Sequence, residues 1–386
     1  MKIRFNFFFV LFILCTLSSC SSLGALKFWE DDSEIELPSE LFDFQESVEL
    51  DLKWTSSLGG GMSLGRNIPF IYEDNIYYLS PEGDLSVLAL ETGKKRWSKE
   101  TGDMVSGAVT VGYKRIFYGT LKGELVALNL ETGNEIWRSQ ITSEVLSPPV
   151  TDGNIVAAQT ADGKISGFDI KTGKQKWFHQ ATIPKLTLRG TASPIIEIGY
   201  IFTGFANGKI AMIYPDSGAI RFEIPITINE GKSELERIVD IDGKSVVSNN
   251  ILVSASYQGN ISAIDLRKGR PAWQEKVSTT KDLAVARSRI AVVGEKDSII
   301  GFGLSTGAIL WEQNGLMLRS LSSPVSVRNN FILGDLEGFV HVIDSKNGFF
   351  VGRKKVSKNE ISEIVVKGKN ILILDSEGKL ILLSIS

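Results

Sequence analysis

Residues 161–177 read Ala161-Asp-Gly-Lys-Ile-Ser-Gly-Phe-Asp-Ile-Lys-Thr-Gly-Lys-Gln-Lys-Trp177, and this unit recurs along the 386-residue chain. In each copy a turn residue is followed ten residues later by a Gly, as in the pairs Gly83/Gly93, Gly123/Gly133, Gly163/Gly173, Gly208/Gly218, Gly259/Gly269, Asp297/Gly307 and Gly338/Gly348. Successive turns lie 40, 40, 45, 51, 38, 41 and 40 residues apart, counting on to Gly378. A period near forty with turn residues at fixed offsets is typical of repeat proteins.

Each unit predicts four short strands, which in the second copy are Gly107–Val111, Arg115–Gly119, Leu125–Leu128 and Glu135–Ser139. Glycines at the turns permit the positive φ that tight hairpins require. The middle strands are almost continuously apolar, which indicates that both faces of each sheet are covered. Four-stranded sheets that cover one another around a channel form an all-β propeller.

A large aromatic residue lies four positions after the second Gly in six copies, and Gly352 takes its place in the seventh. We expect these side chains to pack against the neighbouring blade and bury a large aromatic area. They are Trp97, Trp137, Trp177, Phe222, Trp273 and Trp311.

An eighth unit begins at Asp375 and ends at Ser386, after its third strand. The segment Leu50-Asp-Leu-Lys-Trp54 resembles the missing outer strand, with Trp54 as its docking residue. An N-terminal strand that completes the last blade would leave no free edge. The sequence therefore predicts an eight-bladed β-propeller of four-stranded antiparallel blades, and a seven-bladed ring with a C-terminal hairpin is the alternative.

Residues 1–19 have the pattern of a signal peptide, with Lys2 and Arg4 before the apolar run Phe5–Leu14. Leu17-Ser-Ser-Cys20 matches the bacterial lipobox, which predicts removal of residues 1–19 and acylation of Cys20. An ordinary secretory signal that ends in Cys is the alternative. By resemblance to lipoproteins of Gram-negative bacteria, Ser21 after the Cys favours the outer membrane.

Residues 20–50 contain nine of the ten carboxylates between 21 and 51 and one cation, Lys27, and we expect a flexible acidic tether. The propeller would then span residues 51–386. Residues 52–386 carry 39 basic and 35 acidic side chains, a net charge of +4. A mixed charge of this size does not favour nucleic acid as a partner.

No catalytic or metal-binding pattern is present, and we predict no cofactor. The two histidines, His179 and His341, are isolated and favour structural roles. The stretch Asp169–Trp177 resembles the tryptophan-docking motif of quinoprotein dehydrogenases, which bind pyrroloquinoline quinone (PQQ) and Ca²⁺. The adjacent cysteines that usually hold the quinone in that family are missing here. A PQQ-dependent oxidoreductase and an envelope propeller that binds glycan or peptide remain alternative functions.

The two long spacings place insertions at Gln180–Thr191 and Ile226–Gly243. Both connect the outer strand of one blade to the inner strand of the next, so we expect them side by side on one face. The first displays Leu186, Leu188 and Arg189, which suit a protein interface. The second carries Asp240 and Asp242. The alternative is a local lid in which the leucines pack inward and Arg189 pairs with one of the aspartates.

The lipobox, the tether and the quinoprotein-like propeller together resemble the BamB family, lipoproteins of the outer-membrane β-barrel assembly machinery. The stretches that carry this resemblance most specifically are Leu186–Pro194, Glu236–Asp242, Leu318–Pro324 and Gly334–His341. The resemblance implies a non-enzymatic scaffold on the periplasmic face of the outer membrane. Separately, a closed propeller with no spare edge suggests a monomer. The resemblance also implies that Leu186, Leu188, Arg189, Asp240 and Asp242 contact POTRA domains of a BamA-like barrel protein. Other assembly subunits and unfolded outer-membrane clients are further implied partners.

Overall fold

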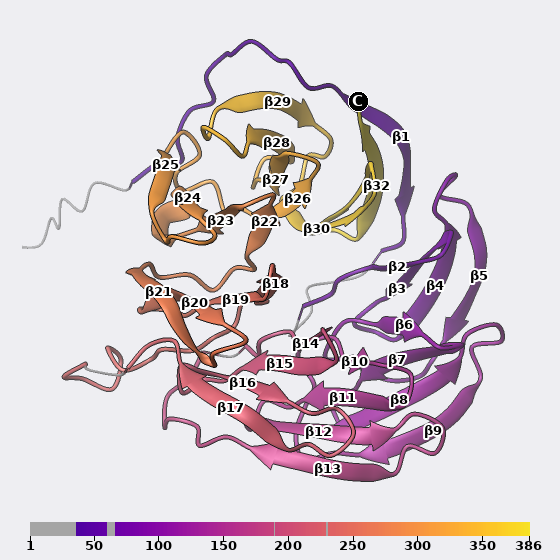
Figure 1. The fold of residues 1–386 in the computed structure, drawn as a ribbon. Helices are drawn as coiled ribbons and strands as arrows, with labels where there is room; N and C mark the ends of the chain where they lie inside the picture. The colour runs from indigo at the N-terminus through magenta and orange to yellow at the C-terminus, as the bar shows by residue number, and fades with distance from the viewer. Residues whose placement is uncertain (1–35, 60–65, 189, 229–230) are drawn as a thin grey trace, which may run out of the picture. The chain divides into compact units, whose positions relative to one another are not determined.

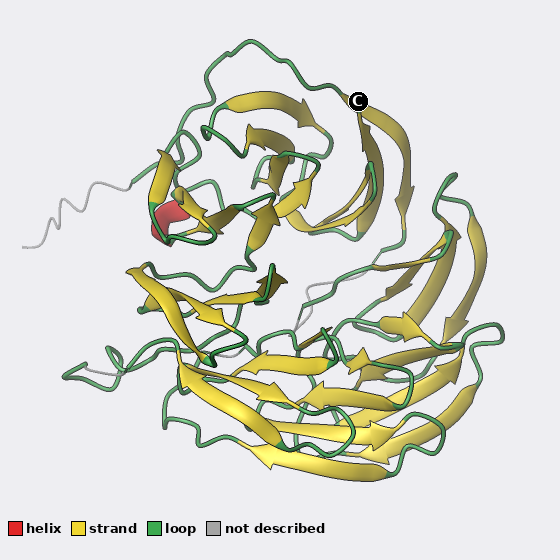
Figure 2. Ribbon diagram, viewed as in Figure 1, coloured by secondary structure: helices red, strands yellow, loops and turns green. Residues whose placement is uncertain are grey.

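Eight four-stranded antiparallel sheets make up the chain where the computed structural model describes it, at residues 36–59, 66–188, 190–228 and 231–386. Residues Pro38–Ser386 form one compact unit, in which the sheets are the blades of a propeller (Figures 1 and 2). The predicted eight-bladed, all-β fold is confirmed, and the seven-bladed alternative is excluded. No helix within the described ranges has the length and apolar character needed to cross a bilayer.

The blades follow the order of the sequence, and each runs from its inner to its outer strand. Blades 1 to 4 are β2 (Phe70–Tyr72), β3 (Asn75–Leu79), β4 (Asp84–Ala89), β5 (Lys95–Glu100); β6 (Thr110–Gly112), β7 (Arg115–Gly119), β8 (Glu124–Asn129), β9 (Glu135–Gln140); β10 (Val150–Thr151), β11 (Ile155–Gln159), β12 (Lys164–Asp169), β13 (Gln175–Gln180); and β14 (Ile195–Glu197), β15 (Tyr200–Gly204), β16 (Lys209–Ile213), β17 (Ile220–Pro225). Blades 5 to 7 are β18 (Val246–Ser248), β19 (Ile251–Ala255), β20 (Asn260–Asp265), β21 (Arg270–Lys276); β22 (Ala284–Ala286), β23 (Arg289–Val293), β24 (Ile299–Gly303), β25 (Ile309–Gln313); and β26 (Val325–Val327), β27 (Asn330–Gly334), β28 (Phe339–Asp344), β29 (Phe350–Lys355). Blade 8 combines β30 (Ile361–Lys367), β31 (Asn370–Asp375) and β32 (Lys379–Ile385) with β1 (Leu50–Ser57), and the short 3₁₀ helix η2 (Glu295–Asp297) lies in blade 6.

The inner strand of blade 2 is shorter than the sequence predicted. It covers Thr110–Gly112 instead of Gly107–Val111. The chain just before it bonds to the next blade, because the Ser106 hydroxyl donates to the carbonyl of Val145 over 2.8 Å. Gly107 also lies so close to that carbonyl that a Cβ atom would be 2.5 Å away. The crowding near the channel therefore replaces pairing within the blade by contacts between blades.

The ring is closed by pairing of the two ends of the propeller. β1 runs antiparallel to β32, with Leu50 opposite Ile385 and Ser57 opposite Lys379. β1 is thus the outer strand of blade 8, as the sequence predicted. Its unpaired edge corresponds to the unpaired edge of the outer strand in every other blade. The last blade consequently has the same four strands as the rest.

The predicted aromatic residues dock on the hairpin of the following blade. Trp54 of blade 8 donates its indole N–H to the Leu90 carbonyl of blade 1 over 2.9 Å. Gly93 lies under the indole, with φ of 68° and its Cβ position 2.5 Å from the ring, so the site requires glycine for both reasons. The same contact joins Trp97 to Gly133, Trp137 to Gly173, Trp177 to Gly218, Trp273 to Gly307 and Trp311 to Gly348, and Phe222 faces Gly269.

Arg66, in the connection from blade 8 to blade 1, bonds acidic residues across the middle of the ring. Arg66 donates to Asp282, which precedes blade 6, over 2.5 Å and to Glu363 of β30 over 3.1 and 3.2 Å. Its backbone N–H donates to the carbonyl of Leu146, which precedes blade 3. These bonds link parts of the ring that are not sequence neighbours.

Part of the predicted tether is bound to blade 7, and we call residues Ser39–Val48 the strap. Ser39 donates its N–H to the Met317 carbonyl over 2.9 Å, and Ser47 and Val48 both donate to the Val351 carbonyl. The expectation of a flexible tether up to residue 50 does not hold for the strap, because these bonds fix its backbone on the outer strand of a blade.

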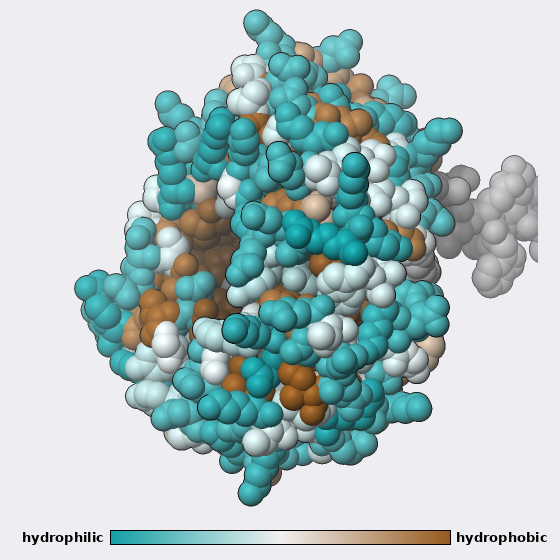
Figure 3. Space-filling model, turned by 90° about the vertical axis from the view of Figure 1, so that its right-hand side faces the viewer, coloured by the Kyte–Doolittle hydropathy of each residue, from teal (hydrophilic) through white to brown (hydrophobic). Residues whose placement is uncertain are grey.

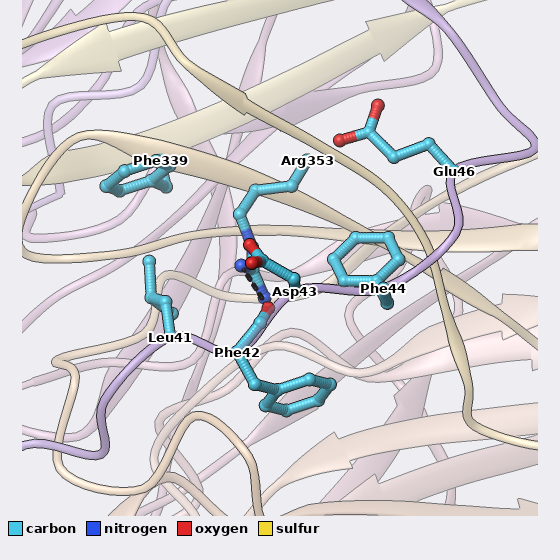
Figure 4. Close-up of a pocket in the computed structure, with 7 residues that line it drawn as sticks. All are labelled: Leu41, Phe42, Asp43, Phe44, Glu46, Phe339 and Arg353. Atoms are coloured by element: carbon cyan, nitrogen blue, oxygen red, sulfur yellow. Dashed lines mark hydrogen bonds between the residues drawn. The ribbon is translucent and has the colours of Figure 1, made fainter.

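Aromatic side chains hold the middle of the strap. The rings of Phe42 and Phe44 lie 5.4 and 5.6 Å from the Phe350 ring, and the Arg353 guanidinium packs over all three. Figure 4 shows Arg353 with Phe42 and Phe44. Arg353 also donates to the Phe42 carbonyl over 2.9 Å. An open cavity of about 370 Å³ lies beside these rings, and Glu46 also lines it.

A buried charged cluster supports the strap from behind. Arg319 bonds both Asp335 (2.8 Å) and the Ser39 carbonyl (2.9 Å), and His341 bonds Asp335 through Nε2 over 2.9 Å. Since His341 Nδ1 accepts from Arg353, its proton is on Nε2. Burial acts to raise the pKa of Asp335, but the hydrogen bonds from His341 and Arg319 outweigh it and keep that pKa below its usual range. His341 is therefore a structural residue, as the sequence favoured.

Replacing Trp177 tests the docking contact. We expect Trp177→Ala to lower the free energy of unfolding by about 3–5 kcal/mol, because the side chain is buried against blade 4 and bonds Pro215. Its neighbour Phe178 is 60% exposed, so Phe178→Ala should cost about 1 kcal/mol or less. Urea denaturation of both variants measures the difference, and equal losses would contradict the docking role.

Candidate functional site

The first insertion leaves blade 3 on the face that carries the hairpins between the second and third strands. Ala181, which follows β13, donates its N–H to the carbonyl of Gly163 in such a hairpin over 3.0 Å. Beyond it the chain exposes Ile183 and Leu186, while Leu188 is half-buried. Apolar side chains are thus presented to solvent by a loop that no blade requires.

The second insertion leaves blade 4 on the same face, since Ile226 donates its N–H to Gly208 of the corresponding hairpin over 2.8 Å. Within its described parts the chain exposes Ile228 and Leu235, at 69% and 67%. A turn closes around Glu236, whose carboxylate accepts the backbone N–H groups of Lys232 and Ser233. The chain then returns inward and becomes fully buried from Ile238 to Ile241.

The two insertions meet at Asp240, as their predicted placement on one face requires. The Leu188 N–H donates to Asp240 Oδ2 over 2.6 Å. Asp242 lies against Gly190, where a Cβ atom would be 2.7 Å from its Oδ1. The side chain of Ile241 fills the space over Gly204 in blade 4. One short segment of the second insertion therefore positions the first insertion and also packs on the blade.

Both aspartates are shifted toward their neutral forms. Burial, and then the charge of Asp242, raise the pKa of Asp240 to about 7, against the opposing effect of the Leu188 hydrogen bond. Burial raises the pKa of Asp242 to about 6. Among the described atoms, Asp240 Oδ1 has no hydrogen-bond partner although it is buried. Ionisation of either carboxyl group in the folded chain is consequently unfavourable.

The structure brings four of the predicted interface residues together and leaves one undescribed. Leu186 is exposed, Leu188 and Asp242 are half-buried, and Asp240 is completely buried. Arg189 and the predicted lipidation site Cys20 lie outside the described residues. Because Asp240 has no exposed surface, its geometry gives it a positioning role behind Leu188 rather than a direct contact.

The sequence analysis missed three exposed apolar residues of the same two loops, Ile183, Ile228 and Leu235. The sequence could have indicated them, because all three lie in insertions. Outside the repeated strands, an apolar residue has no predicted neighbour to pack against.

The space between the insertions is too small for an organic ligand. Thr187, Gly190 and Asp242 line a cavity of about 20 Å³ beneath the loops, together with Gln159 and Ile241. A volume of this size accommodates about one water molecule. The described residues contain no group of three or more His, Cys, Asp or Glu side chains placed to bind a metal ion. The site thus offers an outward surface rather than an inward pocket.

The raised pKa values predict a pH dependence that Asp240→Asn should weaken. In the folded chain the two carboxyl groups retain protons that the unfolded chain loses above its ordinary pKa of about 4. The contribution of these two groups to the free energy of unfolding should therefore be largest below pH 4 and should fall as the pH rises to about 8. Asp240→Asn should remove a few kcal/mol of this fall and make the protein more stable at pH 8, since three pKa units correspond to about 4 kcal/mol at most. Urea denaturation from pH 4 to 8 measures the slope, and an unchanged slope in the variant would refute the assignment.

Asp242→Asn is the matched control. It should lower the pKa of Asp240, because a like charge nearby contributes to the shift.

Comparison with known proteins identifies the family. The family model described as "Outer membrane protein assembly factor BamB" matches residues 81–313 and 277–385. A protein of that name from Pseudomonas aeruginosa is 46% identical over 354 residues, covering 91% of this chain and 93% of the relative. One from Legionella pneumophila is 38% identical over an alignment of 392 residues that covers all of this chain and all of the relative.

Solved structures agree on the fold. The crystal structure of BamB from Moraxella catarrhalis has a TM-score of 0.80 at 24% identity, covering 87% of this chain and all of that one. A europium-containing methanol dehydrogenase has a TM-score of 0.67 at 14% identity over 86% of this chain and 84% of its own, which shows a common fold and nothing about activity. From the family model and the full-length relatives, the chain belongs to the BamB family of outer membrane protein assembly factors.

Proposed function

We propose that the chain is a non-enzymatic scaffold lipoprotein of the outer-membrane β-barrel assembly complex. It docks on the POTRA domains of a BamA-like barrel subunit and assists the folding and insertion of outer-membrane proteins. The observation that carries the proposal is the meeting of the two insertions, where a buried Asp240 fixes the backbone of a loop that displays Leu186.

The surface of these loops has the properties of a protein interface. Leu186, Ile228 and Leu235 are exposed apolar side chains on the insertions, so the propeller does not use these three side chains for its own packing. Apolar anchors surrounded by polar residues carry most of the energy of protein association. A loop whose backbone is already fixed loses little conformational entropy on binding. The bond from Leu188 to Asp240 provides such preorganisation.

The proposal includes attachment to the periplasmic face of the outer membrane. Removal of residues 1–19 leaves Cys20 to carry the lipid, and residues 21–38 link it to the strap and the propeller. More than one acyl chain on one Cys anchors a protein stably. The names of the relatives, which place them in outer-membrane assembly, support this location.

A pull-down from native outer membranes tests the docking site. The tagged lipoprotein should retain a POTRA-bearing barrel protein in mild detergent, and Leu186→Ala/Arg189→Ala should retain at least about tenfold less, because central apolar and Arg residues dominate interfaces. Ile228→Ser/Leu235→Ser tests the part of the surface that the second insertion adds. Ile136→Ala, an exposed apolar residue on β9 of blade 2 and outside both insertions, is the matched control and should bind normally.

The outcomes separate function from site. Normal binding by both loop variants, with unchanged thermal unfolding, would place the docking site elsewhere on the ring. Failure of the unmodified protein to retain any barrel protein would contradict the scaffold function and favour assays for quinone, glycan or peptide binding.

A further inference from the structure

An exposed apolar surface lies on the outer edge of blades 6 and 7, and we call it the rim. It consists of Ile309 and Leu310 of β25, Phe349 in the hairpin before β29, and Phe42 of the strap, whose side chains are between 46% and 66% exposed. Figure 3 shows a different side, where β1 and β5 lie; there hydrophilic residues cover most of the surface, and a hollow with a hydrophobic lining and smaller hydrophobic patches interrupt them. The rim belongs to neither the insertions nor the channel.

The rim residues form one contiguous surface. Trp311 of β25 packs against Gly348, and Gln313 donates to the Gly348 carbonyl over 2.9 Å, so the hairpin with Phe349 lies directly on β25. On the other side the Phe42 ring contacts Phe350. Two blades and the strap therefore contribute to the same edge.

The repeat provides an internal comparison, because the three residues before the docking position are equivalent in every blade. In six blades this triplet contains at least one charged residue, and in blades 6 and 7 it contains none. The six are Lys94-Lys95-Arg96, Asn134-Glu135-Ile136, Lys174-Gln175-Lys176, Ala219-Ile220-Arg221, Arg270-Pro271-Ala272 and Asp51-Leu52-Lys53, and the two are Ala308-Ile309-Leu310 and Phe349-Phe350-Val351. The packing of a blade therefore does not require apolar residues at these three positions. The strap covers Phe350 and bonds Val351, but it does not explain Ile309, Leu310 or Phe349.

The strap brings the start of the propeller to the rim. Its first fixed residue, Ser39, is held by Met317 and Arg319 in the connection from blade 6 to blade 7. Residues 21–38 separate Ser39 from Cys20, which is eighteen residues. Even fully extended, a chain of that length spans at most roughly 65 Å. An acylated Cys20 would therefore keep Ser39 within that distance of the bilayer surface.

We propose that the rim is a membrane-contacting surface, on which Phe349, Leu310 and Ile309 insert among the headgroups of the bilayer that anchors Cys20. The proposal rests on the lipid anchor in the proposed function. Apolar side chains partition into the interfacial region of a bilayer, and the tether supplies the high local concentration that makes a weak contact effective. Lys346 and Glu312 nearby have opposite charges, so the apolar side chains carry the contact.

Spin labels on the full lipoprotein test the rim. After signal-peptide removal Cys20 is the sole cysteine in the sequence, and acylation blocks it, so Phe349→Cys can be labelled selectively with a nitroxide. The protein is reconstituted in vesicles of phosphatidylethanolamine and phosphatidylglycerol. Power-saturation measurements should show, for the label at position 349, a severalfold higher ratio of oxygen to nickel-chelate collisions than for a label introduced by Phe178→Cys. Phe178 is the matched control, as an equally exposed aromatic residue on blade 3.

Leu310→Asp should return the label at position 349 to the aqueous phase. Equal collision ratios at positions 349 and 178 would overturn the proposal. Dipolar broadening at position 349 that disappears on dilution with unlabelled protein would also overturn it, in favour of contact between two copies of the chain. The vesicles contain no barrel protein, so failure here is independent of failure to dock. Flotation of the protein with the vesicles reports the lipid anchor separately.

Discussion

The fold depends on the pairing of β1 with β32, because this contact turns a row of repeats into a closed ring. The pairing joins residues more than three hundred positions apart and supplies blade 8 with its outer strand. It also delivers Trp54 to Gly93 of blade 1, so the docking contact that stacks the other blades continues across the junction. Without β1, blade 8 would expose an unpaired strand, which is a site for aggregation.

The closure also explains why the seventh repeat has Gly352 in place of tryptophan. A docking tryptophan needs the glycine hairpin that joins the third and fourth strands of the next blade. In blade 8 these two strands are the ends of the propeller, and no hairpin connects them. The N-terminal chain passes over Gly352 instead, and a Cβ atom there would be 2.6 Å from the Val48 carbonyl. The rings of Phe42 and Phe44, packed under the Arg353 guanidinium, take the place of the missing tryptophan.

The sequence predicted what recurs and missed what occurs once. Glycine spacing and the docking aromatics specify the blades, their number and their closure, because each copy repeats the same local requirement. The strap could not be predicted, since its carboxylates suggest a solvated chain and the residues that it bonds, Arg319 and Arg353, are 280 and 311 positions away. Burial of Asp240 was equally invisible, because an Asp-x-Asp pattern usually indicates a solvated loop. The stretches Leu318–Pro324 and Gly334–His341 carried the family resemblance, and their structural reason is the cluster of Arg319, Asp335 and His341 behind the strap.

The positions of the strap and the insertions give the ring two functional ends. The insertions flank blade 4 and the strap lies on blade 7, three blades away, so that β17 and β29 are on opposite sides of the propeller (Figure 1). Stiffness between these ends comes from the docking contacts around the perimeter and from Arg66, which joins Asp282, Glu363 and the backbone of Leu146 across the ring. Closed rings with such cross-links deform little, because each blade is packed on both faces. In the proposed function, the lipid anchor at one end would therefore orient the proposed docking surface at the other, and the propeller would act as a rigid spacer whose length is set by its diameter.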